Sequence, residues 1–293
     1  MIRGAYRPND FVHSVTASTA SEIHARVAFI GGGNMAAALI GGLLKNGWPA
    51  SQLRVAEPLA ARAEWLRQTF GVMVAASAAE VAADADAFLL AVKPQQMAAA
   101  LADVQIKPGA LIVSIAAGVR LNTLRRLLGS QLAYVRTMPN TPALFGAGIT
   151  GLYAPDDTSP AARALAESLL SAAGSCVWLT REDELDAVTA LSGSGPAYFF
   201  LLVEALRDAG VALGLSQEVA AQLAAQTCIG SARMVADAGQ DVSTLRANVT
   251  SKGGTTEAAV QHLESAGLRT IFREALAKAD ARAKALGDAL DLV

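Results

Sequence analysis

A glycine-rich turn at 31–36 constrains the fold of this chain more than any other feature of the sequence. It follows the short apolar run Val27–Ile30 and leads into a helical stretch of small residues, so the order is strand, tight turn and helix. The spacing is G-x-G-x-x-A: Gly31 permits the turn, Gly33 lets the backbone approach a ligand, and Ala36 allows close packing of helix on sheet. This context predicts a dinucleotide site, with the pyrophosphate at the positive end of the helix. A turn with purely structural duties is the alternative.

The rest of the first half alternates between two kinds of segment. Short runs rich in Val, Ile, Phe and Leu are separated by longer Ala-rich amphipathic stretches, which is typical of parallel strands joined by helical crossovers. After about Thr180 the strand signals stop and the pattern is helical, with breaks at glycines. The expected strands are 27–30, 53–56, 87–92, 111–115 and 134–136, with further candidates at 149–153 and 176–179.

These patterns predict an α/β fold in which an N-terminal Rossmann doubly wound sheet is followed by an all-helical domain. We expect a disordered extension at 1–24, a dinucleotide-binding Rossmann domain at 25–179, and a helical substrate-binding and dimerisation domain at 180–293. The helical half is apolar and rich in Ala and Gly. Alone it would leave an exposed patch, so we expect a second subunit to bury it.

Composition narrows the classes of partner. The chain has 24 Lys and Arg against 26 Asp and Glu, so it offers no basic field for a polyanion and we expect no nucleic-acid partner. Its apolar stretches are broken well short of the roughly 20 residues that a membrane helix needs, so we expect no membrane partner. Cys176 and Cys228 are too few and too far apart for a disulfide framework or a thiolate metal cluster. We therefore expect a soluble cytoplasmic protein without a metal site.

Glu57 follows the second expected strand and is a candidate for the cofactor site. Ligands of open α/β sheets bind outside the carboxyl ends of the strands, and a ribose-binding carboxylate is expected about 20 residues after the glycines. Glu57 could accept a hydrogen bond from a 2′-hydroxyl, which favours NADH. Arg54 or Arg62 could instead pair with a 2′-phosphate, which favours NADPH. The sequence leaves the choice open, and Glu57 could also be a solvated charge at a strand end.

Two further strand ends should border the same crevice. They are Ala91-Val92-Lys93-Pro94 and Ser114-Ile115-Ala116-Ala117-Gly118. Lys93 is placed to contact cofactor or substrate, although a lysine at a strand end is often only solvated. Met138-Pro139-Asn140-Thr141-Pro142 follows another strand, and its two prolines would stiffen a loop near the nicotinamide end or make a purely structural turn.

In the helical half, Thr250–Glu257 precedes an apolar-periodic run and has the pattern of a helix N-terminus. Gly253 and Gly254 would clear space, so that the N–H groups of Thr255 and Thr256 face a ligand carboxylate. Ordinary helix capping is the alternative. Upstream, the small residues of 191–198 interrupt a long helical pattern and permit close approach by backbone, cofactor or a second subunit, or simply close helix packing.

The sequence also limits the chemistry by what it lacks. His13 and His24 lie in the N-terminal extension, and His262 is expected on a helix surface. Reducing a carbonyl or oxidising an alcohol requires movement of a hydroxyl proton, usually through His or Lys. A protonated imine already carries the positive charge that makes its carbon accept hydride. Orientation and carboxylate binding could then supply most of the catalysis.

Six motifs run in order from about residue 26 to the end of the chain. They are GGGNM at 31–35, AVKP at 91–94, SIAAG at 114–118, MPNTPAL at 138–144, LSGSGPAYFF at 191–200 and SKGGTTEAAV at 251–260. Together they resemble pyrroline-5-carboxylate reductase. The resemblance implies an NAD(P)H-dependent oxidoreductase that transfers hydride to the C=N carbon of 1-pyrroline-5-carboxylate, a cyclic imine, and forms L-proline, the final step of proline biosynthesis. It also implies a homo-oligomer in which helical domains interlock as a dimer, assembled further into a decamer.

The resemblance also implies roles for residues. It assigns NADPH or NADH to Ile30, Gly31, Gly32, Gly33, Asn34, Met35, Ala91, Val92, Lys93, Pro94, Ala116, Ala117, Gly118 and Asn248. Glu57 is added from its place after the second expected strand and is not a hallmark of the family. It assigns the substrate to Ser251, Gly254, Thr255 and Thr256, with the Thr256 hydroxyl near the ring nitrogen as the catalytic group.

The chain departs from the family pattern at Lys252, where the family usually has proline, and this places a cation near the expected carboxylate site. Two other functions remain as alternatives. A β-hydroxyacid dehydrogenase would carry a lysine on the helix after a glycine-rich turn, and 193–205 contains none. A module that binds dinucleotide without turnover is the third hypothesis, and the intact GGTT segment argues against it.

Overall fold

The computed structural model describes residues 25–291, so the expected disordered extension at 1–24 lies outside the described residues. Within this range the chain forms two compact units. The first, the Rossmann unit, holds the residues up to Pro196 together with the segment that starts at Leu276. The second, the helical unit, is Ala197–Ala275. Our boundary at residue 180 does not coincide with this division, because 180–196 and the end of the chain pack with the sheet.

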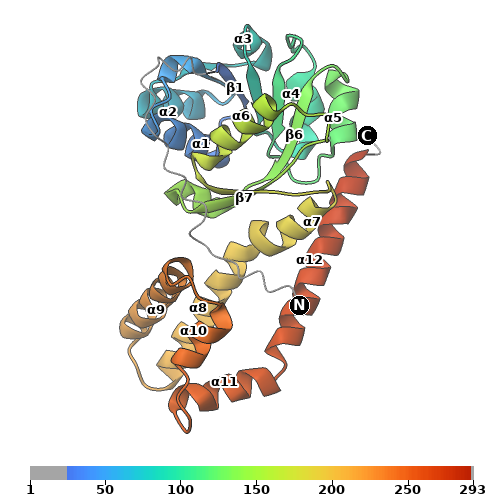
Figure 1. The fold of residues 1–293 in the computed structure, drawn as a ribbon. Coiled ribbons are helices and arrows are strands. Elements are labelled where there is room, and N and C mark those ends of the chain that lie inside the picture. Colours follow the sequence, from blue (N-terminus) through green and yellow to red (C-terminus); the bar gives the residue numbers. More distant parts are fainter. Residues whose placement is uncertain (1–24, 292–293) are drawn as a thin grey trace. The chain divides into compact units, whose positions relative to one another are not determined.

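The Rossmann unit is built on an eight-stranded sheet of order β3-β2-β1-β4-β5-β6-β7-β8 (Figure 1). Neighbouring strands are parallel except for the antiparallel pair β6 and β7. The order reverses at β1, which places the carboxyl ends of β1, β2 and β4 around one crevice. The strands are β1 (Val27–Ile30), β2 (Leu53–Ala56), β3 (Met73–Ala75), β4 (Ala87–Leu90), β5 (Leu111–Ser114), β6 (Ala133–Met138), β7 (Gly148–Tyr153) and β8 (Gly174–Trp178).

The sheet differs from our expectation in several strand bounds, since β6 and β8 begin one and two residues earlier than expected and β6 continues to Met138, and in the two details that follow. Strand β3 was not among the expected strands: it has only three residues, and the short apolar stretch that contains it is followed closely by the Ala-rich start of α3. Strand β4 ends at Leu90 rather than at residue 92, and Ala91 and Val92 continue as loop at the edge of the crevice. The predicted class, a parallel-dominated Rossmann sheet followed by a helical region, is confirmed.

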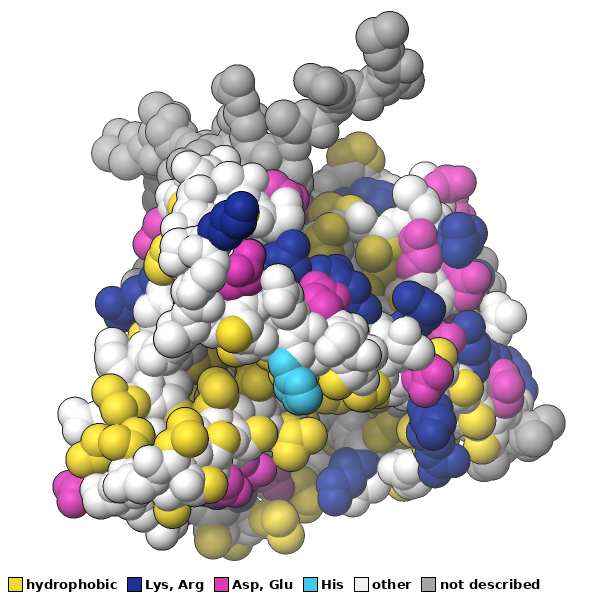
Figure 2. Space-filling model, turned by 90° about the horizontal axis from the view of Figure 1, so that it is seen from below, with side chains coloured by type: hydrophobic (Ala, Val, Ile, Leu, Met, Phe, Trp, Pro, Cys, Tyr) yellow, Lys and Arg dark blue, Asp and Glu magenta, His cyan; other side chains and the backbone are white. Residues whose placement is uncertain are grey.

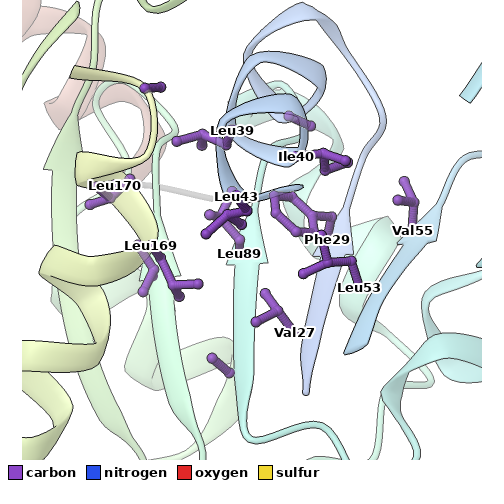
Figure 3. Close-up of a cluster of buried hydrophobic side chains, with 14 of the residues drawn as sticks. Val27, Phe29, Leu39, Ile40, Leu43, Leu53, Val55, Leu89, Leu169 and Leu170 are labelled. Carbon is purple, nitrogen blue, oxygen red and sulfur yellow. The ribbon is translucent and has the colours of Figure 1, made fainter. Parts of the chain in front are cut away.

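Helices cover both faces of the sheet. Alternate residues of a strand face opposite sides, and in β1 Val27 and Phe29 belong to one hydrophobic cluster while Ala28 and Ile30 belong to the other. Figure 3 shows the first cluster, in which Phe29 lies among side chains of α1 and neighbouring strands. The helices of this unit are α1 (Asn34–Lys45), α2 (Ala60–Phe70), α3 (Ala78–Ala82), α4 (Met97–Leu101), α5 (Leu121–Leu128), α6 (Pro160–Ser171) and α7 (Glu184–Val188).

A buried ion-pair network holds α7 to the sheet. Arg136 of β6 is 3% exposed, and its guanidinium lies 3.1 Å from Glu182 and 3.7 Å from Asp186. Burial raises the pKa of the Asp186 carboxyl, while Arg136 acts to lower it. A buried arginine without its carboxylates would be strongly destabilising, so these partners fix α7 against β6. This contact explains why 180–196 belongs to the Rossmann unit.

The end of the last helix, α12 (Leu268–Asp291), is fastened to α5 in the same way. Arg120 donates to Asp291 and to Asp288, each at 2.7 Å, and Thr123 also donates to Asp291. Burial acts to raise the pKa of Asp291, but the hydrogen bonds from Thr123 and Arg120 outweigh it and leave that pKa below its ordinary value. The final turns of α12 therefore pack with the Rossmann unit, although their sequence pattern is purely helical.

The helical unit buries few of its apolar side chains. Its helices are α8 (Gly195–Ala212), α9 (Gln217–Asp237), α10 (Val242–Asn248), α11 (Thr255–Ser265) and the first part of α12. Large side chains such as Phe199, Phe200 and Leu213 are 62%, 67% and 87% exposed. Hydrophobic side chains gather across the face seen in Figure 2. An apolar surface of this kind marks an interaction face.

None of the helices in residues 25–291 combines the length and the apolar character needed to cross a bilayer.

Adjacent glycines in α1 provide a matched test of its packing. A Cβ at Gly42 would lie 2.0 Å from the carbonyl oxygen of Ala172, whereas a Cβ at Gly41 would meet only the ring of Phe70, at 3.3 Å. We expect Gly42→Ala to lower the Tm by about 4–8 °C, since overpacking against backbone costs about 2 kcal/mol. Gly41→Ala should change the Tm by less than about 3 °C. Thermal melts at one protein concentration check this, and equal melting temperatures would contradict it.

Candidate cofactor and substrate sites

A cavity of about 720 Å³ lies in the Rossmann unit at the crevice where the strand order reverses. Many of the residues that the sequence assigned to the cofactor line it: Ile30, Gly31, Gly32, Gly33, Glu57, Ala91, Val92 and Lys93. They come from the ends of β1, β2 and β4, as expected for the carboxyl edge of an open sheet. The volume is in the range of a small-molecule site.

The three glycines of the turn differ in the space that is available for a side chain. Gly31 has a φ of +100°, and a Cβ there would lie 2.8 Å from the carbonyl oxygen of Ala91. At Gly32 a Cβ would lie 2.5 Å from the side chain of Leu66. At Gly33 a Cβ would meet no protein atom within 4 Å. The backbone therefore requires glycine at Gly31, a Cβ at Gly32 would have to displace the Leu66 side chain, and Gly33 keeps open a space that the protein itself does not fill.

The first turn of α1 begins at this open space. Its N-cap, Gly33, has no side chain to cap the helix, and the first turn contains no acidic residue. The first intrahelical bond runs from the N–H of Ala37 to the carbonyl oxygen of Gly33, at 3.0 Å. The preceding N–H groups of the turn have no partner within the helix, and the helix dipole favours an anion there. These residues fit the pyrophosphate of a dinucleotide.

Two charged side chains flank the backbone of Gly32. Glu57 accepts from the N–H of Gly32 at 3.1 Å and from the N–H of Leu59 at 3.0 Å, and it is 9% exposed. Arg62 donates from Nε to the carbonyl oxygen of Gly32 at 2.7 Å, and its guanidinium lies 4.2 Å from the centre of the Trp65 ring. These contacts hold the turn in place from both sides.

The remaining cofactor candidates of this unit are not among the residues that line the cavity. Asn34 and Met35 open α1, and Pro94 follows the exposed Lys93 in a short 3-10 turn. The segment 116–118 follows β5, and a Cβ on Gly118 would lie 3.3 Å from the side chain of Leu290. The structure therefore places 116–118 against the end of α12, a neighbour that the sequence did not predict.

One wall of the cavity was not predicted from the sequence. Residues from the turn between β3 and α3 and from α4 also line it: Ala76, Ser77, Ala78, Ala79, Gln96, Ala99, Ala100, Asp103 and Val104. A signal was available at Ser77 and Glu80, because the S-x-x-E spacing of a capping box marks the start of α3. The N–H and the hydroxyl of Ser77 donate to the Glu80 carboxylate at 3.0 and 2.8 Å. Without β3, that signal could not be tied to the crevice.

Two other motifs come together within the Rossmann unit. The side-chain amide of Asn140 donates to the carbonyl oxygen of Ser192 at 3.1 Å, and the Asn140 side chain accepts from the N–H of Ile149 at 2.9 Å. A Cβ at Gly193 would lie 2.6 Å from the Met138 side chain. The loop 138–142 thus packs on the small-residue break at 191–195, which contains a π-helical turn. Close packing, the structural alternative given for 191–198, is sufficient to explain the small residue at Gly193.

The threonine segment of the helical unit forms the start of α11. Gly253 has a φ of +72°, and its N–H donates to the Glu257 carboxylate at 2.7 Å. A Cβ at Gly254 would lie 2.6 Å from Oγ of Ser251. The N–H groups of Thr255 and Thr256 precede the first intrahelical bond, which Ala258 donates to Gly254 at 3.2 Å. The glycines close a tight turn and leave these two N–H groups facing outward from the helix end.

Asn248 is the last residue of α10, and its side-chain amide lies 3.4 Å from the Gln240 side chain. It belongs to the helical unit, as do Ser251, Gly254, Thr255 and Thr256. Thr256 is half-buried, and Thr255 is exposed. The sequence candidates therefore fall into two groups, one in the Rossmann unit and one in the α10–α11 segment of the helical unit.

Comparison with known proteins covers both groups. The family model for pyrroline-5-carboxylate reductase dimerisation matches 182–286, and the model for coenzyme F420-dependent NADP oxidoreductases matches 26–118. The pyrroline-5-carboxylate reductase of Pseudomonas aeruginosa is 48% identical over 268 residues, which cover 90% of this chain and 98% of that protein. This chain belongs to the pyrroline-5-carboxylate reductase family. The resemblance inferred from its motifs is confirmed.

Solved structures of the family agree with this assignment. A pyrroline-5-carboxylate reductase from Coxiella burnetii superimposes with a TM-score of 0.86 at 41% identity, covering 90% of this chain and 98% of that one. The Plasmodium falciparum pyrroline carboxylate reductase, solved with NADP bound, gives a TM-score of 0.75 at 29% identity over 90% of this chain and 98% of its own. The likeness spans both the Rossmann and the helical regions.

The different roles of Gly33 and Gly31 yield a test of the dinucleotide site. In Gly33→Ala the new methyl group meets no protein atom, so we expect an unchanged Tm and at least a 10-fold weaker Kd for NADH and NADPH. In Gly31→Ala the positive φ and the contact with Ala91 should lower the Tm by several degrees. Melting curves and calorimetric titration of each nucleotide measure both effects. Tight nucleotide binding by Gly33→Ala would contradict this assignment.

Proposed function

We propose that this chain is a reductase that converts 1-pyrroline-5-carboxylate to L-proline with NADPH or NADH as hydride donor. The observation that carries this proposal is the similarity, along 90% of the chain, to proteins named pyrroline-5-carboxylate reductase. The cavity beside the glycine turn supports it independently, because its open space and uncapped helix start fit a dinucleotide. The enzyme class is therefore an oxidoreductase acting on a cyclic imine.

When bound, the nicotinamide supplies the hydride, and the residues of this chain hold and orient the reactants. We assign the pyrophosphate to the backbone of Gly31–Met35 and the ribose to Glu57. Ala91–Pro94 and Ala116–Gly118 border the site toward the nicotinamide, and we assign Asn248 to the cofactor as well. The rigid, closely packed glycine turn gives these backbone donors a fixed geometry.

We assign the substrate to the start of α11. The outward N–H groups of Thr255 and Thr256 are suited to a carboxylate, and the helix dipole adds to the attraction. Ser251 and Gly254 shape this end, since the Ser251 carbonyl accepts from the N–H of Gly254 at 3.0 Å. The Thr256 hydroxyl is the group that we assign to the ring nitrogen.

The protonated imine explains how a site without histidine can work. His262 is exposed on α11, at the far end of the helix from its threonines, and the two other histidines precede residue 25. A protonated C=N group needs no general acid to activate its carbon. The task left to the protein is to bind the carboxylate, fix the ring and exclude water, which positioned backbone and hydroxyl groups can do.

We also propose that the protein works as a homo-oligomer with the dimer as its basic unit and a decamer as its full assembly. The match of 182–286 to the family's dimerisation model and the exposed apolar side chains of the helical unit support self-association. Cys176 and Cys228 are free thiols, which suits the reducing cytoplasm that we propose as its location.

Replacing Thr256 tests its role. We expect Thr256→Val, which keeps the shape but removes the hydroxyl, to lower kcat/KM for 1-pyrroline-5-carboxylate about 100-fold, the size typical for loss of one positioned donor. Thr256→Ser keeps the hydroxyl and should lose less than about 10-fold. Steady-state assays with each reduced nicotinamide make the measurement. Unchanged kinetics in Thr256→Val would remove Thr256 from the mechanism, and cofactor binding without any turnover by the unmodified protein would favour a binding module instead.

A further inference from the structure

The Glu57 carboxylate is fixed at the wall of the cofactor cavity. It is 9% exposed, Oε2 accepts from the N–H of Gly32 at 3.1 Å, and Oε1 accepts from the N–H of Leu59 at 3.0 Å. Because a backbone donor holds each oxygen, the group cannot turn away from the cavity without losing two hydrogen bonds. A carboxylate has about four acceptor positions, so positions remain for hydroxyl donors of a ligand.

This arrangement distinguishes a hydroxyl from a phosphate. In a Rossmann sheet, the acidic residue that follows the second strand meets the adenosine ribose at its 2′ position. A 2′-hydroxyl can donate to Glu57. A 2′-phosphate offers acceptors, and its negative charges repel the carboxylate in a partly desolvated place where screening is weak. Burial and fixed geometry make this repulsion hard to relieve by rotating the side chain.

Of the cations Arg54, Arg62 and Lys93, the two arginines are bonded to other groups and the lysine lies on another side of the cavity. Arg62 donates from Nε to the Gly32 carbonyl oxygen at 2.7 Å and stacks on Trp65. Arg54 donates to the carbonyl oxygen of Ala83 at 2.8 Å. Lys93 lines the cavity from the β4 side and not from the end of β2, where Glu57 lies. Arg62 is thus the cation best placed to attract a 2′-phosphate, against the repulsion by Glu57. The test must separate the effects of these two residues on NADPH binding.

We infer that Glu57 makes this reductase prefer NADH over NADPH. The inference rests on the proposed function in one respect, namely that the cavity binds a nicotinamide dinucleotide. It concerns this chain's own residue at the end of β2, and the bound NADP of the Plasmodium falciparum structure belongs to a protein that is 29% identical. NADPH can still enter the cavity, but its 2′-phosphate must be accommodated against a fixed carboxylate.

Calorimetric titration of NADH and NADPH, without substrate, tests the inference on the full-length protein. For the unmodified protein we expect the Kd of NADPH to exceed that of NADH at least 10-fold. In Glu57→Gln the ratio of the two constants should fall to about 1, because the charge that repels the 2′-phosphate is gone, whereas the loss of one backbone hydrogen bond weakens both nucleotides alike. Both nucleotides are measured on one variant, so a loss of stability that lowers the active fraction does not change the ratio.

Two control variants separate the effect of the Glu57 charge from the effects of other charged side chains. Glu64→Gln makes the same chemical change at an exposed position of α2, where the carboxylate pairs with Arg67 and does not line the cavity, and it should leave the ratio unchanged. Arg62→Met removes the competing cation and should also preserve the preference for NADH. A preference for NADPH in the unmodified protein that is lost in Arg62→Met would overturn the inference.

The outcomes also separate this inference from the proposed function. Equal or reversed affinities, together with normal reduction of 1-pyrroline-5-carboxylate, would overturn the role of Glu57 alone. Failure of both nucleotides to bind would overturn the dinucleotide site and the proposed function with it. A ratio that falls in Glu57→Gln and in neither control supports Glu57 as the residue that sets cofactor preference.

Discussion

The close approach of the glycine turn to the neighbouring strand ends is the constraint on which the rest of this structure depends. The N–H of Gly31 donates to the carbonyl oxygen of Ala56 at 2.9 Å, and the position of its missing Cβ is 2.8 Å from the Ala91 carbonyl oxygen. This one residue therefore brings together the ends of β1, β2 and β4. Any side chain here would push the three ends apart, and with them the walls of the cavity.

Charge around the turn gives the cavity its chemical character. The backbone of Gly32 is bonded on one side to Glu57 and on the other to Arg62, so a carboxylate and a guanidinium lie near the same peptide unit. The first turn of α1 presents its N–H groups next to them. Their functions differ, since the helix start suits the phosphates of a dinucleotide while the carboxylate suits the sugar hydroxyls. The fold supplies both by placing β2 directly beside β1.

The two units differ in how much of their apolar surface they bury. The sheet covers its two faces with its own helices, and its large side chains such as Phe29 and Phe88 are fully buried. The helices of the second unit leave Phe200 and Leu213 largely exposed. Such a unit gains little from folding by itself, and association with another copy would supply the missing burial. Stability and assembly are then linked, as expected for a family with a dimerisation region.

The sequence by itself determined the Rossmann class, most of the strands, the glycine turn and the family. These features are local: apolar runs, glycine spacing and motif order can all be read along the chain. The strand β3 is only three residues long and was not recognised in its short apolar stretch, and its omission hid the cavity wall at Ser77. The helical start at Thr255 was also readable, because its glycines and its capping Glu257 lie within a few residues.

Only the tertiary structure decided which distant groups meet. The pairing of Arg120 with Asp288 and Asp291 joins residues more than 160 positions apart, and it attaches the end of α12 to the sheet unit. The sequence left Glu57 as either a ribose-binding candidate or a solvated charge at a strand end, and its bonds to Gly32 and Leu59 fix it at the cavity. Sequence patterns report on neighbours along the chain, whereas the burial and bonding of a charge depend on which segments the fold packs around it.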